Sequence, residues 1–176
     1  MKLQDLLEST SLISPEREKA IRDGYMSYYD DEKGEWEADS YLGMVHELHT
    51  KGGVLHRCVF LDKISDLRTE DLGTHWTGES QDEGAIAELM AGHGYDDGEE
   101  VFFIRAEIGP GQITVEGVDV EGNPEEFEVG IKNQSALRNV TLHKASMWGG
   151  KGDKVADIDI VNNKIKPVQS DDKTDS

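Results

Sequence analysis

The chain has 176 residues, 36% of them hydrophobic and 31% charged, which is about the length of one domain with a modest hydrophobic core. Asp and Glu number 37 against 18 Lys and Arg, so the formal net charge is −19. This surplus of negative charge argues against general binding to nucleic acid or to an anionic membrane surface, because both require clustered Lys and Arg. A single cysteine, Cys58, excludes a framework of disulfides.

Signals for membrane insertion or export are missing from the sequence. No apolar run approaches the roughly 18 residues that a membrane-spanning helix needs. The first ten residues place Asp5 and Glu8 among leucines, which does not fit the apolar segment of a signal peptide. We therefore expect a soluble, cytoplasmic protein.

Helical signals come first along the chain. Ser14 followed by Pro15 is typical of a helix start, with Ser as the N-cap and Pro at the first helical position, and predicts a helix over 15–29. The acidic stretch 30–37 is expected to be a loop. A second helix is predicted over 38–50, ended by a pair of glycines.

The pattern then changes to short apolar and alternating runs separated by Gly, Pro and Asn, which is typical of β-strands. Helices followed by a run of strands predict an α+β fold with a mostly antiparallel β core. Strands are predicted over 54–61, 72–77, 101–108, 112–118, 127–132 and 137–145, and a short helix over 83–92.

A single domain is expected over 1–150, with a helical part over 1–53 and a β core over 54–150. The remaining segment, 151–176, is predicted to be an acidic and lysine-bearing tail. An edge strand is expected at 155–161, with disorder beyond it.

Arg57 stands out because it lies inside an otherwise apolar strand. Charged side chains are rarely buried unless they are paired, so this arginine should have an anionic partner. One interpretation is a structural salt bridge or an edge position. The other is a guanidinium that binds a ligand phosphate or ribose with two parallel hydrogen bonds.

The segment Gly73-Thr74-His75-Trp76-Thr77 is a second candidate. Strand alternation puts His75 and Thr77 on one face, with Thr74 and Trp76 on the other. An imidazole beside a hydroxyl offers a donor and an acceptor suited to a ribose or an amide. The alternative is a half-buried strand with a tryptophan in the core.

The third candidate is the turn and strand at 122–129, with the sequence GNPEEFEV. Period 2 puts Glu126 and Glu128 on the same face, with Phe127 opposite. Two like charges in such positions repel unless water or a cationic ligand lies between them. In a chain with 37 carboxylates such spacing also occurs by chance, so taken alone this motif favours a solvated face.

Taken in order, these segments resemble the mono-ADP-ribosyltransferase family. The resemblance is to the branch of the family that has an arginine on a strand, a serine/threonine strand motif and a Glu-x-Glu motif. The segments that carry it are, in the same order, LHRCVFLD, LGTHWTGES and GNPEEFEVGI. Small phage and bacterial members of this kind often show a similar Gly-x-His-Trp-Thr strand. The resemblance implies a two-sheet β core, and host cytoplasm or virion as the location if the chain comes from a phage.

The resemblance also implies NAD as the substrate and assigns roles to single residues. Arg57 would hold NAD near its phosphates and nicotinamide ribose. The Thr74–Thr77 segment would take the place of the serine motif, with Thr74, His75 and Thr77 shaping the nicotinamide pocket. A transferase of this family releases nicotinamide and passes ADP-ribose to a protein side chain, here arginine as the first candidate.

The resemblance implies different roles for the two glutamates, Glu128 and Glu126. Glu128 would match the catalytic residue, which hydrogen-bonds the nicotinamide-ribose 2′-hydroxyl and stabilises the oxocarbenium-like carbon. Glu126 would match the residue that orients or deprotonates the acceptor. The stretch 117–125 would be the loop that meets the target protein.

Two other functions remain open on the sequence. One is a non-catalytic acidic protein, such as a virion component or an inhibitor that mimics the charge of DNA, although positive residues are interleaved throughout the chain. The other is an NAD glycohydrolase that uses the same site with water as acceptor. No metal site is predicted, because His46 and His49 have no third ligand at a fixed spacing.

Overall fold

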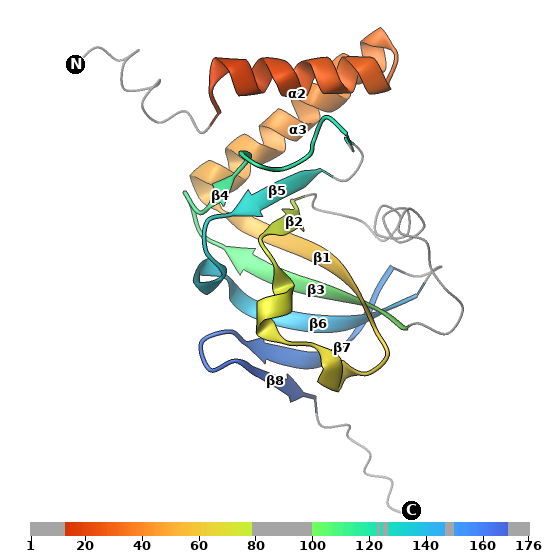
Figure 1. The fold of residues 1–176 in the computed structure, drawn as a ribbon, viewed down its shortest axis with the longest axis vertical. Helices are drawn as coiled ribbons and strands as arrows, with labels where there is room; N and C mark the ends of the chain where they lie inside the picture. The colour runs from red at the N-terminus through yellow and green to blue at the C-terminus, as the bar shows by residue number, and fades with distance from the viewer. Residues whose placement is uncertain (1–12, 79–99, 123, 125–126, 147–149, 169–176) are drawn as a thin grey trace, which may run out of the picture.

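The computed structural model describes residues 13–78, 100–122, 124, 127–146 and 150–168 (Figure 1). Two helices precede the strands, so the predicted α+β class is confirmed; the predicted helix over 83–92 lies outside the described residues. The elements are α2 (Pro15–Tyr28), α3 (Asp31–Lys51), β1 (Gly53–Leu61), β2 (His75–Thr77), β3 (Glu100–Ile108), β4 (Ile113–Thr114), β5 (Glu128–Ile131), β6 (Arg138–Ser146), β7 (Gly150–Asp159) and β8 (Lys164–Pro167), with short 3₁₀ turns at Ile64–Asp66, Thr69–Leu72 and Gln134–Ala136.

Capping side chains set the starts of both helices. The Ser14 hydroxyl accepts a hydrogen bond from the Arg17 amide at 3.1 Å, as the Ser-Pro signal predicts. The Asp30 carboxylate caps α3 by accepting from the Lys33 amide at 3.0 Å. The acidic stretch 30–37, predicted to be a loop, is therefore the first part of α3. Acidic residues in a first turn stabilise a helix because they face the positive end of its dipole.

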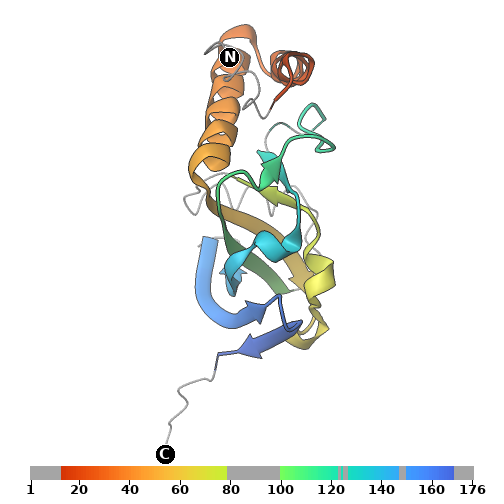
Figure 2. The same ribbon diagram turned by 90° about the vertical axis from the view of Figure 1, so that its left-hand side faces the viewer.

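The inner face of α3 has the spacing of an amphipathic helix. Its buried residues recur every three or four positions: Gly34, Ala38, Tyr41, Val45 and Leu48. A Cβ added to Gly34 would lie 2.8 Å from the Tyr25 carbonyl oxygen, so this glycine allows α2 and α3 to pack closely. The two helices lie together at one end of the molecule, and β8 lies at the other (Figures 1 and 2).

The eight strands form one antiparallel sheet in the order β4-β5-β2-β1-β3-β6-β7-β8. The sequence resemblance implies two sheets, whereas the hydrogen-bonded array here is continuous. The physical reason is the position of β1, which pairs with β2 on one side and with β3 on the other. The long β1–β3 register, from Gly53↔Ile108 to Leu61↔Glu100, joins the two halves.

The C-terminal segment belongs to the sheet. The strand predicted at 155–161 is longer, over Gly150–Asp159, and is an inner strand because β6 and β8 pair on its two sides. Alternation explains its place, since Ala156 and Ile158 are buried and contribute to the core. The sequence predicts disorder beyond residue 161, whereas residues 164–167 form β8. Residues 169–176 lie outside the described part of the chain.

The core connects the helices to the half of the sheet that carries β5 and β2. Tyr25 and Tyr41 of the helices are fully buried in the same cluster as Trp76 and Val129 of the strands. This packing brings the N-terminal helices next to the segments that the sequence singles out. Neither helix of the described chain is apolar enough over a sufficient length to cross a membrane.

Candidate functional site

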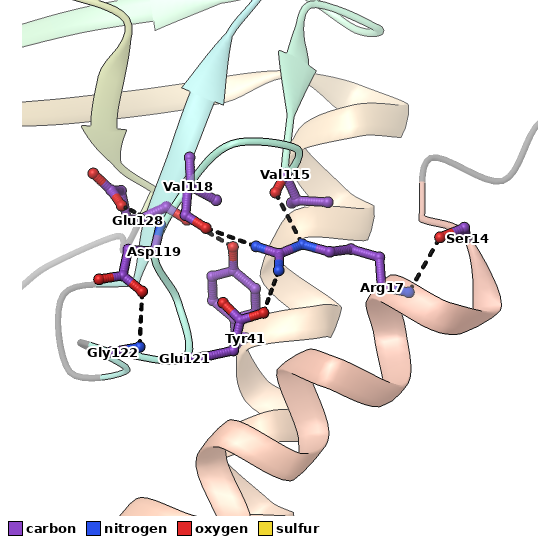
Figure 3. Close-up of polar contacts among 9 residues, drawn as sticks. All are labelled: Ser14, Arg17, Tyr41, Val115, Val118, Asp119, Glu121, Gly122 and Glu128. Atoms are coloured by element: carbon purple, nitrogen blue, oxygen red, sulfur yellow. Dashed lines mark hydrogen bonds and ion pairs between the residues drawn. The ribbon is translucent and has the colours of Figure 1, made fainter.

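The Glu128 side chain, at the start of β5, is the centre of a polar cluster. It is 19% exposed, and both of its carboxylate oxygens have partners. The Oε1 atom lies 3.2 Å from Nδ1 of His75. The Oε2 atom accepts a hydrogen bond from the Asp119 amide at 3.1 Å, and Figure 3 shows these two residues. A carboxylate that is this enclosed and held from two directions keeps one orientation.

Strand register places three of the predicted residues on one face. In the β2–β5 pair, Thr77 lies opposite Glu128 and His75 lies opposite Gly130, so the side chains of His75, Thr77 and Glu128 point to the same side. Trp76 points to the other side and is 2% exposed. The alternation predicted for this short strand is confirmed.

Thr74 stands apart from this cluster. It immediately precedes β2 and is exposed, and its carbonyl oxygen accepts a hydrogen bond from the Ile131 amide at 2.9 Å. The described contact of Thr74 is therefore one between backbones. Glu126, the first glutamate of the Glu-x-Glu pattern, lies outside the described residues.

Arg57 reaches the cluster from β1 by an indirect route. The register pairs His56 with Thr77, so alternation directs Arg57 to the opposite side of the sheet from His56. Its guanidinium nevertheless donates from Nη1 to the His75 carbonyl oxygen at 2.7 Å. His75 therefore links the two charged residues: its carbonyl oxygen accepts from Arg57, and its side chain lies against Glu128.

Gly73 makes room for the Arg57 guanidinium. Its φ is +64°, a conformation that glycine adopts without strain, and a Cβ there would lie 2.9 Å from Arg57 Nη1. Its carbonyl oxygen accepts from Nε2 of Gln134 at 3.1 Å. The motif Gly73–Thr77 contains this glycine, but no local pattern in the sequence assigns it this role; in the structure it ends the 3₁₀ turn Thr69–Leu72.

Three buried polar atoms beside the cluster have no hydrogen-bond partner within the described structure. They are Nε of Arg57, Nε1 of Trp76 and Oγ1 of Thr77. Buried polar groups are nearly always paired, and leaving one unpaired costs about 1–3 kcal/mol. Three such atoms on neighbouring residues of β1 and β2 are therefore a feature that fold stability alone does not explain. Of the three, the Thr77 hydroxyl is on the side of Glu128, where it could serve an amide or a ribose, whereas the Trp76 indole lies in the core on the other side.

Burial changes the chemistry of two groups on β1. It lowers the pKa of the Arg57 guanidinium, while the negative charge of Glu128 acts in the opposite direction. Burial also raises the pKa of the Cys58 thiol to about 12, with the charge of Arg57 opposing it. Cys58 is therefore a neutral thiol at physiological pH, which makes it a poor nucleophile.

The helices hold the backbone that leads into Glu128. The Tyr41 hydroxyl donates to the Glu128 carbonyl oxygen at 2.6 Å. The preceding residue, Phe127, has φ +49°, which is uncommon for an aromatic residue. Its ring packs edge-on against Tyr25 and Tyr41, at centroid distances of 6.4 and 5.9 Å. The sequence gives no sign of this contact, because no local pattern connects Tyr41 with a strand residue 87 positions away.

A separate hollow of about 550 Å³ lies over β6, β7 and β8. Its polar lining includes Arg138, Thr141, Asp157 and Lys166, and it contains none of the predicted site residues. Within the described residues, no group of three or more His, Cys, Asp or Glu side chains is arranged to hold a metal ion.

Comparisons with protein-family models, with characterised proteins and with solved structures find no match to this chain.

Proposed function

We propose that this protein cleaves the bond between nicotinamide and ribose in NAD and transfers ADP-ribose to a protein side chain. The observation that carries the proposal is the Glu128 carboxylate held beside His75 of β2, whose carbonyl oxygen in turn accepts a hydrogen bond from Arg57 of β1. These residues come from three adjacent strands, β5, β2 and β1, and each belongs to a motif that resembles the mono-ADP-ribosyltransferases.

The chemistry suits a fixed carboxylate. When the bond from C1′ of the ribose to the nicotinamide nitrogen breaks, its electron pair stays with nicotinamide and positive charge develops at C1′. A preorganised negative group next to that carbon stabilises the transition state more than the ground state. Glu128 fits this role because its orientation is already set by His75 and the Asp119 amide. A new bond then forms between C1′ and the acceptor atom, which gives up its proton.

The other residues fit the binding of a dinucleotide. Arg57 is a half-buried cation in a chain of net charge −19, and a guanidinium is the side chain best suited to two oxygens of a phosphate. The Thr77 hydroxyl, on the same side of the sheet as Glu128 and unpartnered among the described residues, supplies a donor and an acceptor for the carboxamide or ribose of NAD. We assign the acceptor side to Glu126, as the family resemblance implies.

The test measures nicotinamide released from NAD by the wild type and by Glu128→Gln, with and without added acceptor protein. We expect the substitution to lower release by about 10²–10³-fold, the usual effect of removing one preorganised charge-stabilising group. Glu47→Gln is the matched control, because Glu47 is a glutamate of α3 with a 66% exposed side chain, and it should leave release unchanged. Labelled ADP-ribose bound to the acceptor would distinguish a transferase from a glycohydrolase.

Substituting Glu126 separates the two half-reactions. If Glu126 acts on the acceptor, Glu126→Gln should abolish transfer while nicotinamide release to water continues. A wild-type protein that neither binds NAD in calorimetry nor releases nicotinamide would contradict the proposed function. A stable complex with another protein, formed without NAD and unaffected by Glu128→Gln, would then favour the interaction-protein alternative.

A further inference from the structure

Arg17 of α2 binds the loop 115–122, which precedes β5 and Glu128. Its guanidinium donates from Nε to the Val115 carbonyl oxygen at 3.2 Å and from Nη2 to the Val118 carbonyl oxygen at 2.7 Å. Its Nη1 forms an ion pair with Glu121. Figure 3 shows the side chain extending from α2 into the curve of the loop. The Arg17 side chain is only 15% exposed, so these bonds are made away from bulk water.

The same loop makes the second contact to the Glu128 carboxylate. Asp119 lies between the Arg17-bound residues and donates its amide to Glu128 Oε2 at 3.1 Å. The Asp119 side chain closes a turn by accepting from the Gly122 amide at 2.9 Å. Loop 115–122 is therefore attached to α2 on one side and to Glu128 on the other.

The geometry requires an arginine. One planar guanidinium serves three oxygens that lie in different directions, two of them on the backbone. Lysine carries a compact ammonium and cannot reproduce this fork. The other arginine of α2, Arg22, pairs with Glu18 and Asp39, so its ion pairs stay within the two helices.

We infer that Arg17 is a positioning residue for the proposed reaction. It does not touch Glu128; it holds loop 115–122 so that the Asp119 amide fixes the orientation of the Glu128 carboxylate. The structural half of this inference concerns the loop alone, and the catalytic half rests on the proposed function. The N-terminal helix thereby takes part in the site through one side chain.

The test compares Arg17→Gln with Arg22→Gln, which removes the same charge from the same helix. Two quantities are measured: hydrogen exchange of the Asp119 amide, and the kcat for nicotinamide release alongside the Kd for NAD. For Arg17→Gln we expect about tenfold faster exchange at Asp119, because the loop opens locally. We also expect a kcat about 10–100-fold lower, since small misplacements of a reacting group are costly. The Kd for NAD should change by less than about threefold, because Arg57 and β2 are untouched.

Two milder variants cover the case in which Arg17→Gln does not fold. Arg17→Lys keeps the charge and can keep one partner, and Glu121→Gln keeps the bonds of Arg17 to the two carbonyls. Both should show the same pattern with smaller changes in Asp119 exchange and kcat. Arg22→Gln should change neither quantity.

Each outcome decides one half of the inference. Unchanged exchange at Asp119 in a folded Arg17→Gln protein would show that the arginine does not hold the loop. Faster exchange with an unchanged kcat would show that the loop does not position Glu128 for catalysis. If the wild type releases no nicotinamide, the proposed function fails and the positioning role fails with it, while the exchange measurement still decides whether Arg17 holds the loop.

Discussion

The two sides of Glu128 differ in how their polar atoms are paired. On the loop side, the Arg17 guanidinium uses all three of its nitrogens, on two carbonyl oxygens and a carboxylate. On the strand side, the Arg57 guanidinium donates to the His75 carbonyl oxygen. Among the residues that the structure describes, Nε of Arg57 and Oγ1 of Thr77 are buried with no hydrogen-bond partner, as is Nε1 of Trp76 in the core behind β2.

This contrast distinguishes residues that stabilise the fold from residues that are available to bind a ligand. A paired polar group stabilises the fold, whereas an unpaired buried one costs free energy that packing elsewhere must offset. Unpaired buried polar groups occur most often at functional sites, because a group that is to bind a ligand cannot already be hydrogen-bonded within the fold. The loop side therefore holds Glu128, and under the proposed function Arg57 and Thr77 on the strand side are the groups that bind NAD.

The largest expected effect comes from removing the Arg57 guanidinium. If Arg57 binds the phosphates, Arg57→Gln should weaken NAD binding by about 100-fold, since a charge-assisted bond contributes about 1.5–3 kcal/mol. Calorimetry of NAD binding measures this, with Arg22→Gln as the matched control of equal charge change. Equal Kd values for wild type and Arg57→Gln would mean that this arginine is only structural. The strand side of Glu128 would then not differ in function from the loop side.

A smaller effect is expected from Thr77→Val, and its two parts have opposite signs. Valine has nearly the same shape and removes an unpartnered hydroxyl, so the free energy of unfolding should rise by about 1 kcal/mol. NAD binding should weaken by about tenfold, because the hydroxyl is lost to the ligand. Thermal unfolding and calorimetry measure the two quantities.

The control for that substitution is Thr141→Val on β6. The Thr141 hydroxyl is hydrogen-bonded to Nε2 of His143 at 2.8 Å, so its removal should lower stability and leave NAD binding unchanged. A Thr77→Val protein that is destabilised to the same degree would show that the Thr77 hydroxyl is satisfied in solution.

The smallest expected effect concerns Tyr41 and pH. Burial raises the pKa of the Tyr41 phenol above its ordinary value near 10, with opposition from Arg17. Because the folded state holds this proton more tightly, the stability it contributes is complete below pH 10 and is lost as pH rises above that value. Tyr41→Phe should lower the free energy of unfolding by about 1 kcal/mol at neutral pH, through loss of the bond to the Glu128 carbonyl. It should also flatten the decline above pH 10.

Unfolding by denaturant between pH 7 and pH 11 would measure this. Tyr28→Phe is the control, because Tyr28 is 52% exposed and its substitution should leave the alkaline decline intact. An alkaline decline in Tyr41→Phe that equals that of the wild type would contradict the assigned cause.

The sequence by itself determined the features that depend on neighbouring residues. The Ser14–Pro15 start of α2, the α+β class and the alternation of His75, Trp76 and Thr77 all follow from local rules of capping and period. It also pointed to Glu128, His75, Thr77 and Arg57 as one group, through the order of their motifs. The same capping rules also apply to the start of α3, where Asp30 is the N-cap. The prediction of a loop over 30–37 was wrong because a run of acidic residues is typical both of loops and of the first turn of a helix.

Only the tertiary structure decided which distant residues meet. Arg17 and Glu121 are 104 positions apart, and Tyr41 and Glu128 are 87 apart, so no spacing rule connects them. The continuity of the sheet through β1, and the place of β7 inside it, likewise depend on pairing between strands whose individual patterns are compatible with several arrangements. Local propensities specify elements, whereas the contacts that orient Glu128 arise only when the core closes around the two helices and the sheet.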